Sequence, residues 1–197
     1  MTLLPIDGIR FEFDDSWSVA KWDESRWYLD GIHKLNGELN DRPEGTKAVD
    51  AIGVRDDAPY LFEIKDFRGF AIENKQRQLQ ELPLEIGLKA RDTVAGLLGW
   101  VALGKQDELP LRWVRAIHGQ RQLVRVVTLV AEDSSRPGEP LYKRDARELE
   151  RASRLKQRLA WLTPRVLLHD PLRDADKLQR IGVLAHSEAN AGPARPR

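Results

Sequence analysis

The chain contains no cysteine among its 197 residues, and only one methionine. The absence of cysteine excludes a disulfide framework, a zinc–thiolate site and a cysteine nucleophile. No apolar run approaches the about 20 residues that span a bilayer, so we expect no membrane partner and a cytoplasmic location. Net charge is also small: 32 basic and 31 acidic residues leave +1. A role in binding nucleic acid would therefore need local rather than overall positive charge.

Several motifs of common enzyme classes are missing as well. The four histidines are isolated in the sequence and show no HExxH spacing, which argues against a histidine-based metal or nucleophile site. No GxxxxGK[ST] or GxGxxG follows a predicted strand, which argues against an ATPase motor or a dinucleotide-dependent enzyme. Any energy-driven partner would be a separate polypeptide.

One segment places charged residues inside apolar surroundings. Residues 48–69, AVDAIGVRDDAPYLFEIKDFRG, read as two strands around a turn centred between Asp56 and Asp57. Symmetric pairing about that centre sets Asp50 opposite Glu63. Directly opposed residues have Cβ atoms roughly 5 Å apart, and two carboxylates that close repel each other unless a cation compensates them.

Lys65 lies two residues after Glu63, so the pleat of a strand puts both side chains on one face, while Ile64 points to the other. Such charges on an exposed strand are often plain cross-strand ion pairs. Here, however, both faces of the pair are apolar, which is typical of a buried central pair in which charges are usually paired or metal-bound. The sequence therefore predicts a divalent-metal site with an adjacent ammonium group.

These residues resemble the PD-(D/E)XK nuclease superfamily, whose motif is an Asp ending one strand followed by Glu-X-Lys on the next. The match is Asp50, twelve intervening residues, and Glu63-Ile64-Lys65, with Val49 in place of the proline of the family name. The resemblance implies that Asp50, Glu63 and the backbone carbonyl of Ile64 hold Mg²⁺, or Mn²⁺ in its place. It also implies that Lys65 orients or deprotonates the water that attacks phosphorus.

Hydrophobic periodicity predicts an α/β fold in one domain over residues 1–186, with a disordered tail over 187–197. The alternation of strands and helices indicates a mixed central sheet flanked by helices, and the resemblance implies an αβββαβ restriction-endonuclease-like core. We read residues 30–45 mainly as loop, with a helix over 25–35 as the alternative. The other predicted elements are strands at 9–13, 18–22, 123–131 and 165–169, helices at 83–104, 142–162 and 174–185, and a bend or hairpin at 113–122.

Further site residues are less determined by sequence. Nucleases of this type often use an additional acid, and the candidates are Asp23, Glu24, Glu38 and Glu44, of which Glu44 is best placed by chain distance. Each of them is otherwise a solvated surface acid.

The sequence also offers basic candidates. Lys89 and Asp92 share one helix face, where they either reach a phosphate and a metal-bound water or form an intrahelical ion pair. Arg68 is a second candidate for phosphate binding, with a solvated loop arginine as the alternative. The helix over 142–162 carries arginines at 3-4 spacing, which we interpret as a solvated face with intrahelical pairs rather than a DNA-binding stripe.

From these features we expect a Mg²⁺-dependent nuclease acting on DNA, with RNA not excluded. The alternative is a degenerate nuclease fold that serves as a nucleic-acid or protein interaction module. A homodimer and a separate partner protein are both compatible with the sequence.

Overall fold

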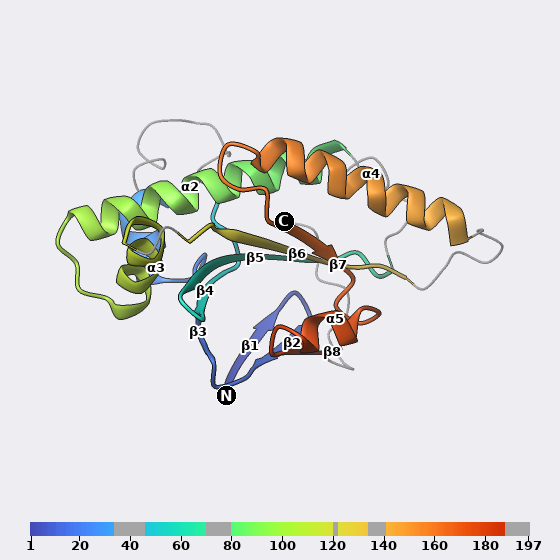
Figure 1. Cartoon of the computed structure of the whole chain (residues 1–197), viewed down its shortest axis with the longest axis horizontal. Helices are drawn as coiled ribbons and strands as arrows, with labels where there is room; N and C mark the ends of the chain where they lie inside the picture. The colour runs from blue at the N-terminus through green and yellow to red at the C-terminus, as the bar shows by residue number, and fades with distance from the viewer. Residues whose placement is uncertain (34–45, 70–79, 120–121, 134–140, 188–197) are drawn as a thin grey trace.

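A five-stranded sheet lies at the centre of the protein, with the longer α-helices on one face and a three-stranded sheet with a short helix on the other (Figure 1). The computed structural model describes residues 1–33, 46–69, 80–119, 122–133 and 141–187. The strands are β1 (Thr2–Ile6), β2 (Ile9–Phe13), β3 (Trp17–Lys21), β4 (Ala51–Arg55), β5 (Ala58–Asp66), β6 (Arg125–Ala131), β7 (Val166–His169) and β8 (Val183–Ser187). The helices are the π-helix η1 (Tyr28–His33) and the α-helices α2 (Leu82–Ala102), α3 (Glu108–His118), α4 (Leu141–Leu159) and α5 (Ala175–Gln179).

The large sheet has the strand order β3-β4-β5-β6-β7. Strand β4 pairs antiparallel with both β3 and β5, whereas β6 and β7 run parallel to β5. Helices α2 and α3 connect β5 to β6, and α4 connects β6 to β7. This mixed sheet with flanking helices confirms the predicted fold class. The first helix of the predicted αβββαβ order does not precede β3, because the β1–β2 hairpin occupies residues 2–13.

The hairpin of β4 and β5 has the predicted register. Ala51 pairs with Phe62 and Arg55 with Ala58, so the turn is centred between Asp56 and Asp57. Both turn residues have positive φ angles, 48° and 56°, as a two-residue hairpin turn requires.

Strand β5 separates two hydrophobic clusters. Its odd-numbered residues, such as Leu61, face α2, α3 and α4, whereas Phe62 and Ile64 face the small sheet β1-β2-β8. Because side chains alternate along a strand, Glu63 and Lys65 belong to the helix-covered face. The charged residues of the motif therefore lie beneath helices rather than on an open sheet surface.

The prediction of a bend or hairpin over residues 113–122 is wrong, because α3 extends to His118. Pro110, Trp113 and Val114 are buried and Ile117 packs against the same cluster, which is the 3-4 spacing of a helix face. This short amphipathic pattern is hard to recognise in the sequence, because it includes a tryptophan and polar residues follow it directly.

The predicted helix over residues 174–185 is only partly right. Helix α5 ends at Gln179, Gly182 adopts a φ of +69°, and the chain continues as β8. Strand β8 pairs with β2, so two segments near opposite ends of the sequence form one sheet. Ser187 is the last residue of β8, and the rest of the predicted tail lies outside the described residues, as do residues 34–45 of the predicted loop. None of the described helices is long and apolar enough to cross a membrane.

Trp17 joins the two sheets. Its ring packs edge-on against Phe13, Tyr60 and Phe62, and its indole N–H donates a hydrogen bond of 2.7 Å to the carbonyl oxygen of Ile181. Trp161, in contrast, is 55% exposed.

We expect Trp17→Phe to lower the free energy of unfolding by about 2 kcal/mol, since it removes buried volume and leaves the Ile181 carbonyl without its donor. For a chain of this size that corresponds to a melting temperature lower by roughly 4–8 °C. Calorimetry or circular dichroism would measure the shift, with Trp161→Phe as the exposed control. Equal shifts in the two variants would contradict the role assigned to Trp17.

Candidate functional site

Asp50, Glu63 and Lys65 come together at one end of the β4–β5 pair, as the register predicts. Glu63 is fully buried and Asp50 is 7% exposed. The Asp50 carboxylate accepts a hydrogen bond of 2.6 Å from the backbone N–H of Ile64 on the neighbouring strand. The Lys65 ammonium lies 3.0 Å from Glu63 Oε1. The two acids and the lysine of the motif thus form one contiguous group.

Two neighbouring elements fix the backbone around Asp50. The N–H of Trp22, just after β3, donates to the Asp50 carbonyl oxygen at 2.9 Å. The N–H of Val49 donates to the hydroxyl of Thr93 on α2 at 3.1 Å. Asp50 is therefore held against β3 on one side and against α2 on the other.

Lys89 of α2 is a fourth member of the group. Its ammonium lies 2.6 Å from Glu63 Oε1 and 3.5 Å from Asp50 Oδ1, and the residue is buried. Asp92, predicted as its alternative partner, accepts instead from the backbone N–H of Lys47 and pairs with Arg91. Lys89 thus pairs with the two buried acids rather than with Asp92, and its predicted contact with a phosphate stays a prediction.

Glu85 is a residue that sequence reasoning missed. Its carboxylate lies 4.0 Å from the Lys65 ammonium, at the border of the group. It precedes Lys89 by four residues, so the two share one face of α2. That spacing is the signal that could have identified it once Lys89 was considered.

Burial and like charge dominate the electrostatics of Asp50. Burial, followed by the repulsion of Glu63, raises the pKa of Asp50 to about 7, although both lysines and the Ile64 N–H act in the opposite direction. Burial disfavours the charged form of Lys89, but the attraction of Glu63 and Asp50 outweighs it and raises the pKa of Lys89. The same balance raises the pKa of Lys65. Both lysines are consequently charged at neutral pH.

The donor set is compatible with a hard divalent cation. Glu63 Oε2 is buried and has no hydrogen-bond partner among the described residues. Mg²⁺ keeps several waters and is commonly held by one or two carboxylates, which Asp50 and Glu63 supply. Within the described ranges no group of three or more His, Cys, Asp or Glu side chains is arranged to hold a metal ion. Any ion here would thus rely on these two carboxylates and on oxygen ligands such as water or the Ile64 carbonyl.

The other candidate acids are only partly placed. Asp23, in the turn after β3, has a raised pKa because of burial and the neighbouring Glu24, and it lies within electrostatic range of Lys89. Glu24 pairs with Lys21 at 2.9 Å. Glu38 and Glu44 lie outside the described residues.

Arg68 connects the two sheets. Its guanidinium binds both carboxylate oxygens of Asp66, with Nε 2.9 Å from Oδ1, and Nη1 donates to the Ser187 hydroxyl at 2.7 Å. Arg68 therefore already has an acidic partner, and its predicted contact with phosphate stays a prediction.

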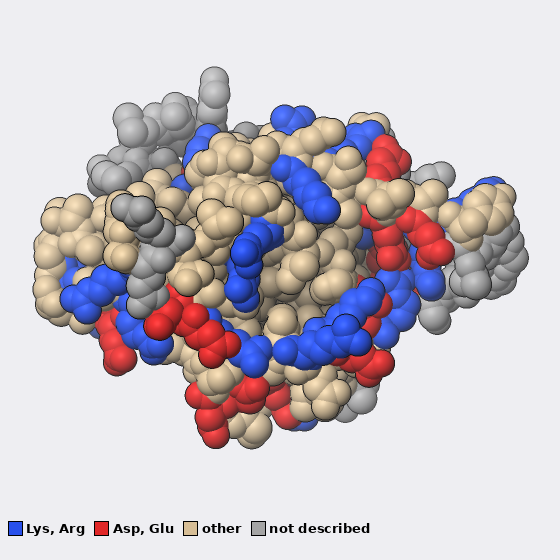
Figure 2. Space-filling model, in the orientation of Figure 1, with Lys and Arg blue, Asp and Glu red and all other residues tan. Residues whose placement is uncertain are grey.

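Figure 2 shows the charge distribution on one face of the molecule. Several basic side chains lie separately over the middle of this face, while acidic side chains gather toward its lower and right-hand edges. The described residues of this face do not form one continuous basic patch, in agreement with the near-zero net charge.

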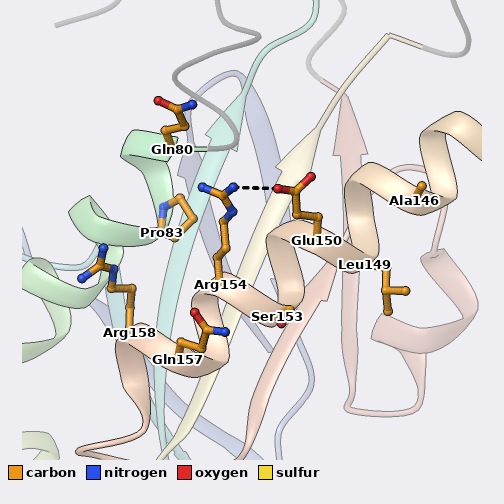
Figure 3. Close-up of a pocket in the computed structure, with 9 residues that line it drawn as sticks. All are labelled: Gln80, Pro83, Ala146, Leu149, Glu150, Ser153, Arg154, Gln157 and Arg158. Carbon is orange, nitrogen blue, oxygen red and sulfur yellow. Dashed lines mark hydrogen bonds and ion pairs between the residues drawn. The ribbon is translucent and has the colours of Figure 1, made fainter.

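An open groove of about 630 Å³ lies between the beginning of α2 and the exposed face of α4 (Figure 3). Arg154 and Arg158 line it, and Arg154 pairs with Glu150 at 2.7 Å. This pair confirms the intrahelical interaction expected on α4. Arg151 departs from the predicted solvated stripe, because it is only 2% exposed and pairs with Glu132.

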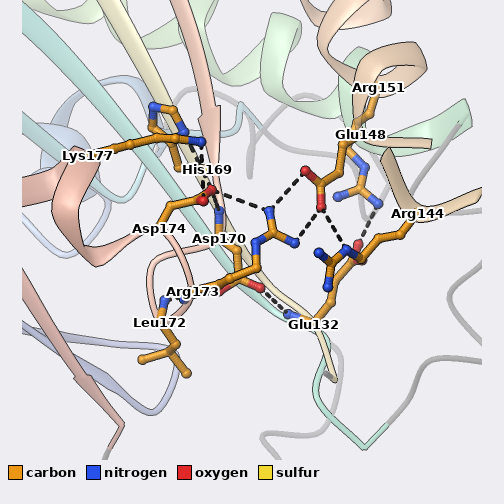
Figure 4. A network of polar contacts seen from close by, with 10 residues as sticks. All are labelled: Glu132, Arg144, Glu148, Arg151, His169, Asp170, Leu172, Arg173, Asp174 and Lys177. Carbon is orange, nitrogen blue, oxygen red and sulfur yellow. Dashed lines mark hydrogen bonds and ion pairs between the residues drawn. The ribbon is translucent and has the colours of Figure 1, made fainter. Parts of the chain in front are cut away.

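A network of ion pairs joins α4 to the carboxyl ends of β6 and β7 (Figure 4). Arg173 binds both carboxylate oxygens of Glu148 at 2.6 and 2.9 Å and also pairs with Asp174 at 3.3 Å. Burial lowers the pKa of His169, which lies 3.7 Å from Asp174. The pairs cross between helix, strand and loop, so we assign this network to holding α4 on the sheet.

Comparison with known proteins gives a partial likeness. The chain is 30% identical over 117 residues to the cysteine–tRNA ligase of Neisseria meningitidis, an alignment that covers 50% of this chain and 17% of the ligase. The chain thus spans less than a fifth of that relative's length. No family model and no solved structure matches the chain.

The raised pKa of Asp50 predicts a pH-dependent cost to stability. Between its ordinary value of 3.8 and about 7, the folded protein holds a proton that the unfolded chain has released. Stability contributed by this proton is present at low pH and is lost as the pH rises through 7. We expect Asp50→Asn to raise the melting temperature at pH 8 in EDTA by at least about 2–4 °C, corresponding to roughly 1 kcal/mol.

The gain should shrink toward pH 5, where Asp50 itself is neutral. Thermal melts from pH 5 to 8 would measure it, with Asp145→Asn on the exposed face of α4 as the matched control. A gain that is independent of pH, or a loss at pH 8, would contradict the electrostatics assigned to Asp50.

Proposed function

We propose that the protein is a Mg²⁺-dependent nuclease that hydrolyses phosphodiester bonds in DNA, with Mn²⁺ as an alternative cofactor. Asp50 and Glu63 are the proposed metal ligands, together with the carbonyl of Ile64, and Lys65 is the proposed catalytic lysine. The observation that carries the proposal is the buried Glu63 Oε2, which has no partner among the described residues and lies beside Asp50 and two ammonium groups.

The order of the elements supports the same proposal. Three antiparallel strands, a helical connection and a strand parallel to the third follow one another from β3 to β6. Asp50 precedes the second of these strands, and Glu63 and Lys65 belong to the third. The resemblance to PD-(D/E)XK nucleases implies this sequence of strands and a Glu-X-Lys on the third of them, but it implies an Asp that ends a strand, whereas Asp50 directly precedes β4.

In the proposed mechanism, a bound divalent cation supplies Lewis acidity that polarises a phosphoryl oxygen and lowers the pKa of water. Asp50, directly before β4, and Glu63, on the neighbouring strand β5, would hold that ion. Lys65 is charged at neutral pH, so it stabilises negative charge developing on the phosphoryl group and orients the attacking water. Because a charged ammonium cannot accept a proton, we favour electrostatic assistance by Lys65 over abstraction of a proton from the water.

A non-catalytic interaction module is the second candidate. Two lysines already neutralise the two carboxylates, and the described residues supply no third acidic ligand to that pair. Such a protein would bind nucleic acid or another protein without cleaving it.

RNA is the second candidate substrate. The partial likeness is to a ligase whose name includes tRNA, and the proposed chemistry at phosphorus is the same for both polymers. RNA substrates therefore belong in the same assay.

The proposed activity predicts metal-dependent cleavage that requires the motif residues. Plasmid DNA, single-stranded DNA and a tRNA transcript would be incubated with Mg²⁺, Mn²⁺ or EDTA. We expect Asp50→Ala and Lys65→Met to reduce the cleavage rate by at least about 100-fold, because each removes charge directly at the reacting centre.

Asp145→Ala and Lys156→Met, both exposed on α4, are the matched controls and should cleave at the wild-type rate. Cleavage that persists in both motif variants would contradict the proposed site. Tight binding of any of the polymers without cleavage under any metal condition would favour the interaction module.

A further inference from the structure

We propose that Lys89 is an internal counter-cation whose ammonium occupies the place needed by the divalent ion, so that metal binding requires Lys89 to move away from Glu63. This inference rests on the proposed metal-dependent function and adds a coupling between metal and substrate binding. The residues involved are Asp50, Glu63, Lys89 and Glu85.

The contact distances assign this position to Lys89 rather than to Lys65. The Lys89 ammonium contacts both carboxylates, whereas the ion pairs of Lys65 are with Glu63 and Glu85. At Glu63 Oε1 the distance is 2.6 Å for Lys89 and 3.0 Å for Lys65. An ion bridging Asp50 and Glu63 would meet Lys89 first.

Charge balance leads to the same conclusion. Asp50 and Glu63, when ionised, are matched by Lys65 and Lys89, so the four side chains together are neutral. A divalent ion added to this group would leave two uncompensated positive charges in a largely buried place, which is strongly unfavourable. Withdrawal of one ammonium from the carboxylates reduces that excess.

A nearby acid can receive the displaced ammonium. Glu85 lies one turn before Lys89 on the same face of α2, and its charge already acts on Lys89. Asp23, a half-buried residue next to Trp22, is also within electrostatic range of Lys89. Neither Glu85 nor Asp23 is one of the two proposed metal ligands, so either could pair with Lys89 while the ion is bound.

A substrate phosphate would be a stronger partner for the displaced Lys89 ammonium than these two acids. A phosphate approaching a metal-loaded site would meet an ammonium group no longer neutralised by Glu63, and charge-assisted contacts to phosphate are among the strongest in proteins. Lys89 would therefore contact phosphate only after the metal has bound. The proposed order makes it a positioning residue in the metal-free state and a substrate contact in the loaded state.

Mn²⁺ binding to the full-length protein tests this inference without relying on cleavage. Isothermal titration calorimetry would compare the wild type with Lys89→Met and with the control Lys156→Met. We expect Lys89→Met to bind Mn²⁺ at least about tenfold more tightly, because no ammonium must be displaced, and Asp50→Ala to abolish binding in both backgrounds. The control should bind as the wild type does.

A second variant and a second measurement keep the test decisive. Lys89→Gln retains an N–H donor without the charge, so it replaces Lys89→Met if that variant folds poorly. The second measurement is the rise in melting temperature on adding Mn²⁺, which should be larger for the Lys89 variant than for the wild type.

The remaining outcomes separate the two proposals. Asp50-dependent Mn²⁺ binding that is equal or weaker in the Lys89 variants would overturn the role of Lys89 and leave the metal site intact. Absence of Mn²⁺ binding in the wild type and in every Lys89 variant would overturn the metal site itself, and the counter-cation with it.

Discussion

The burial of two carboxylates on adjacent strands is the constraint on which this structure depends. Asp50 and Glu63 repel each other in a place with little water, so the fold requires positive charge at the same depth. Lys65 comes from the strand itself, whereas Lys89 comes from α2. The helix must therefore lie over the β4–β5 pair at one rotation and one height, and the hydrogen bond from Val49 to α2 reinforces that position.

Local rules were sufficient to predict the hairpin and the opposition of its acids. A two-residue turn and the period of a strand fix the register, and burial of both faces follows from the apolar residues around Glu63. The second sheet could not be predicted in this way, because β2 and β8 lie near opposite ends of the sequence. Their pairing depends on tertiary packing around Trp17, which no local pattern reveals.

The difference between local patterns and tertiary packing also explains why the sequence alone did not assign Lys89 and Glu85 to their places in the site. Helical spacing placed Lys89 and Asp92 on one face but could not decide between a phosphate, a metal-bound water and an intrahelical pair. Burial separates the two residues in the structure. The Lys89 ammonium reaches the buried carboxylates, while the Asp92 carboxylate accepts a hydrogen bond from the N–H of Lys47. Glu85 was overlooked since its relevance depends on the position of α2 over Lys65, a property of the assembled fold.

Side-chain exposure around Glu63 also bears on how a phosphate would approach in the proposed nuclease. Hydrophobic clusters cover both faces of β5, and side-chain exposure falls from 17% at Lys65 and 16% at Glu85 to 11% at Lys89 and zero at Glu63. A phosphate would therefore arrive past Lys65 and Glu85. In the proposed nuclease the Glu85 carboxylate would repel an anion there, so approach would become favourable only once additional positive charge resides deeper in the site. The proposed order is therefore binding of the cation first and of the nucleic acid second.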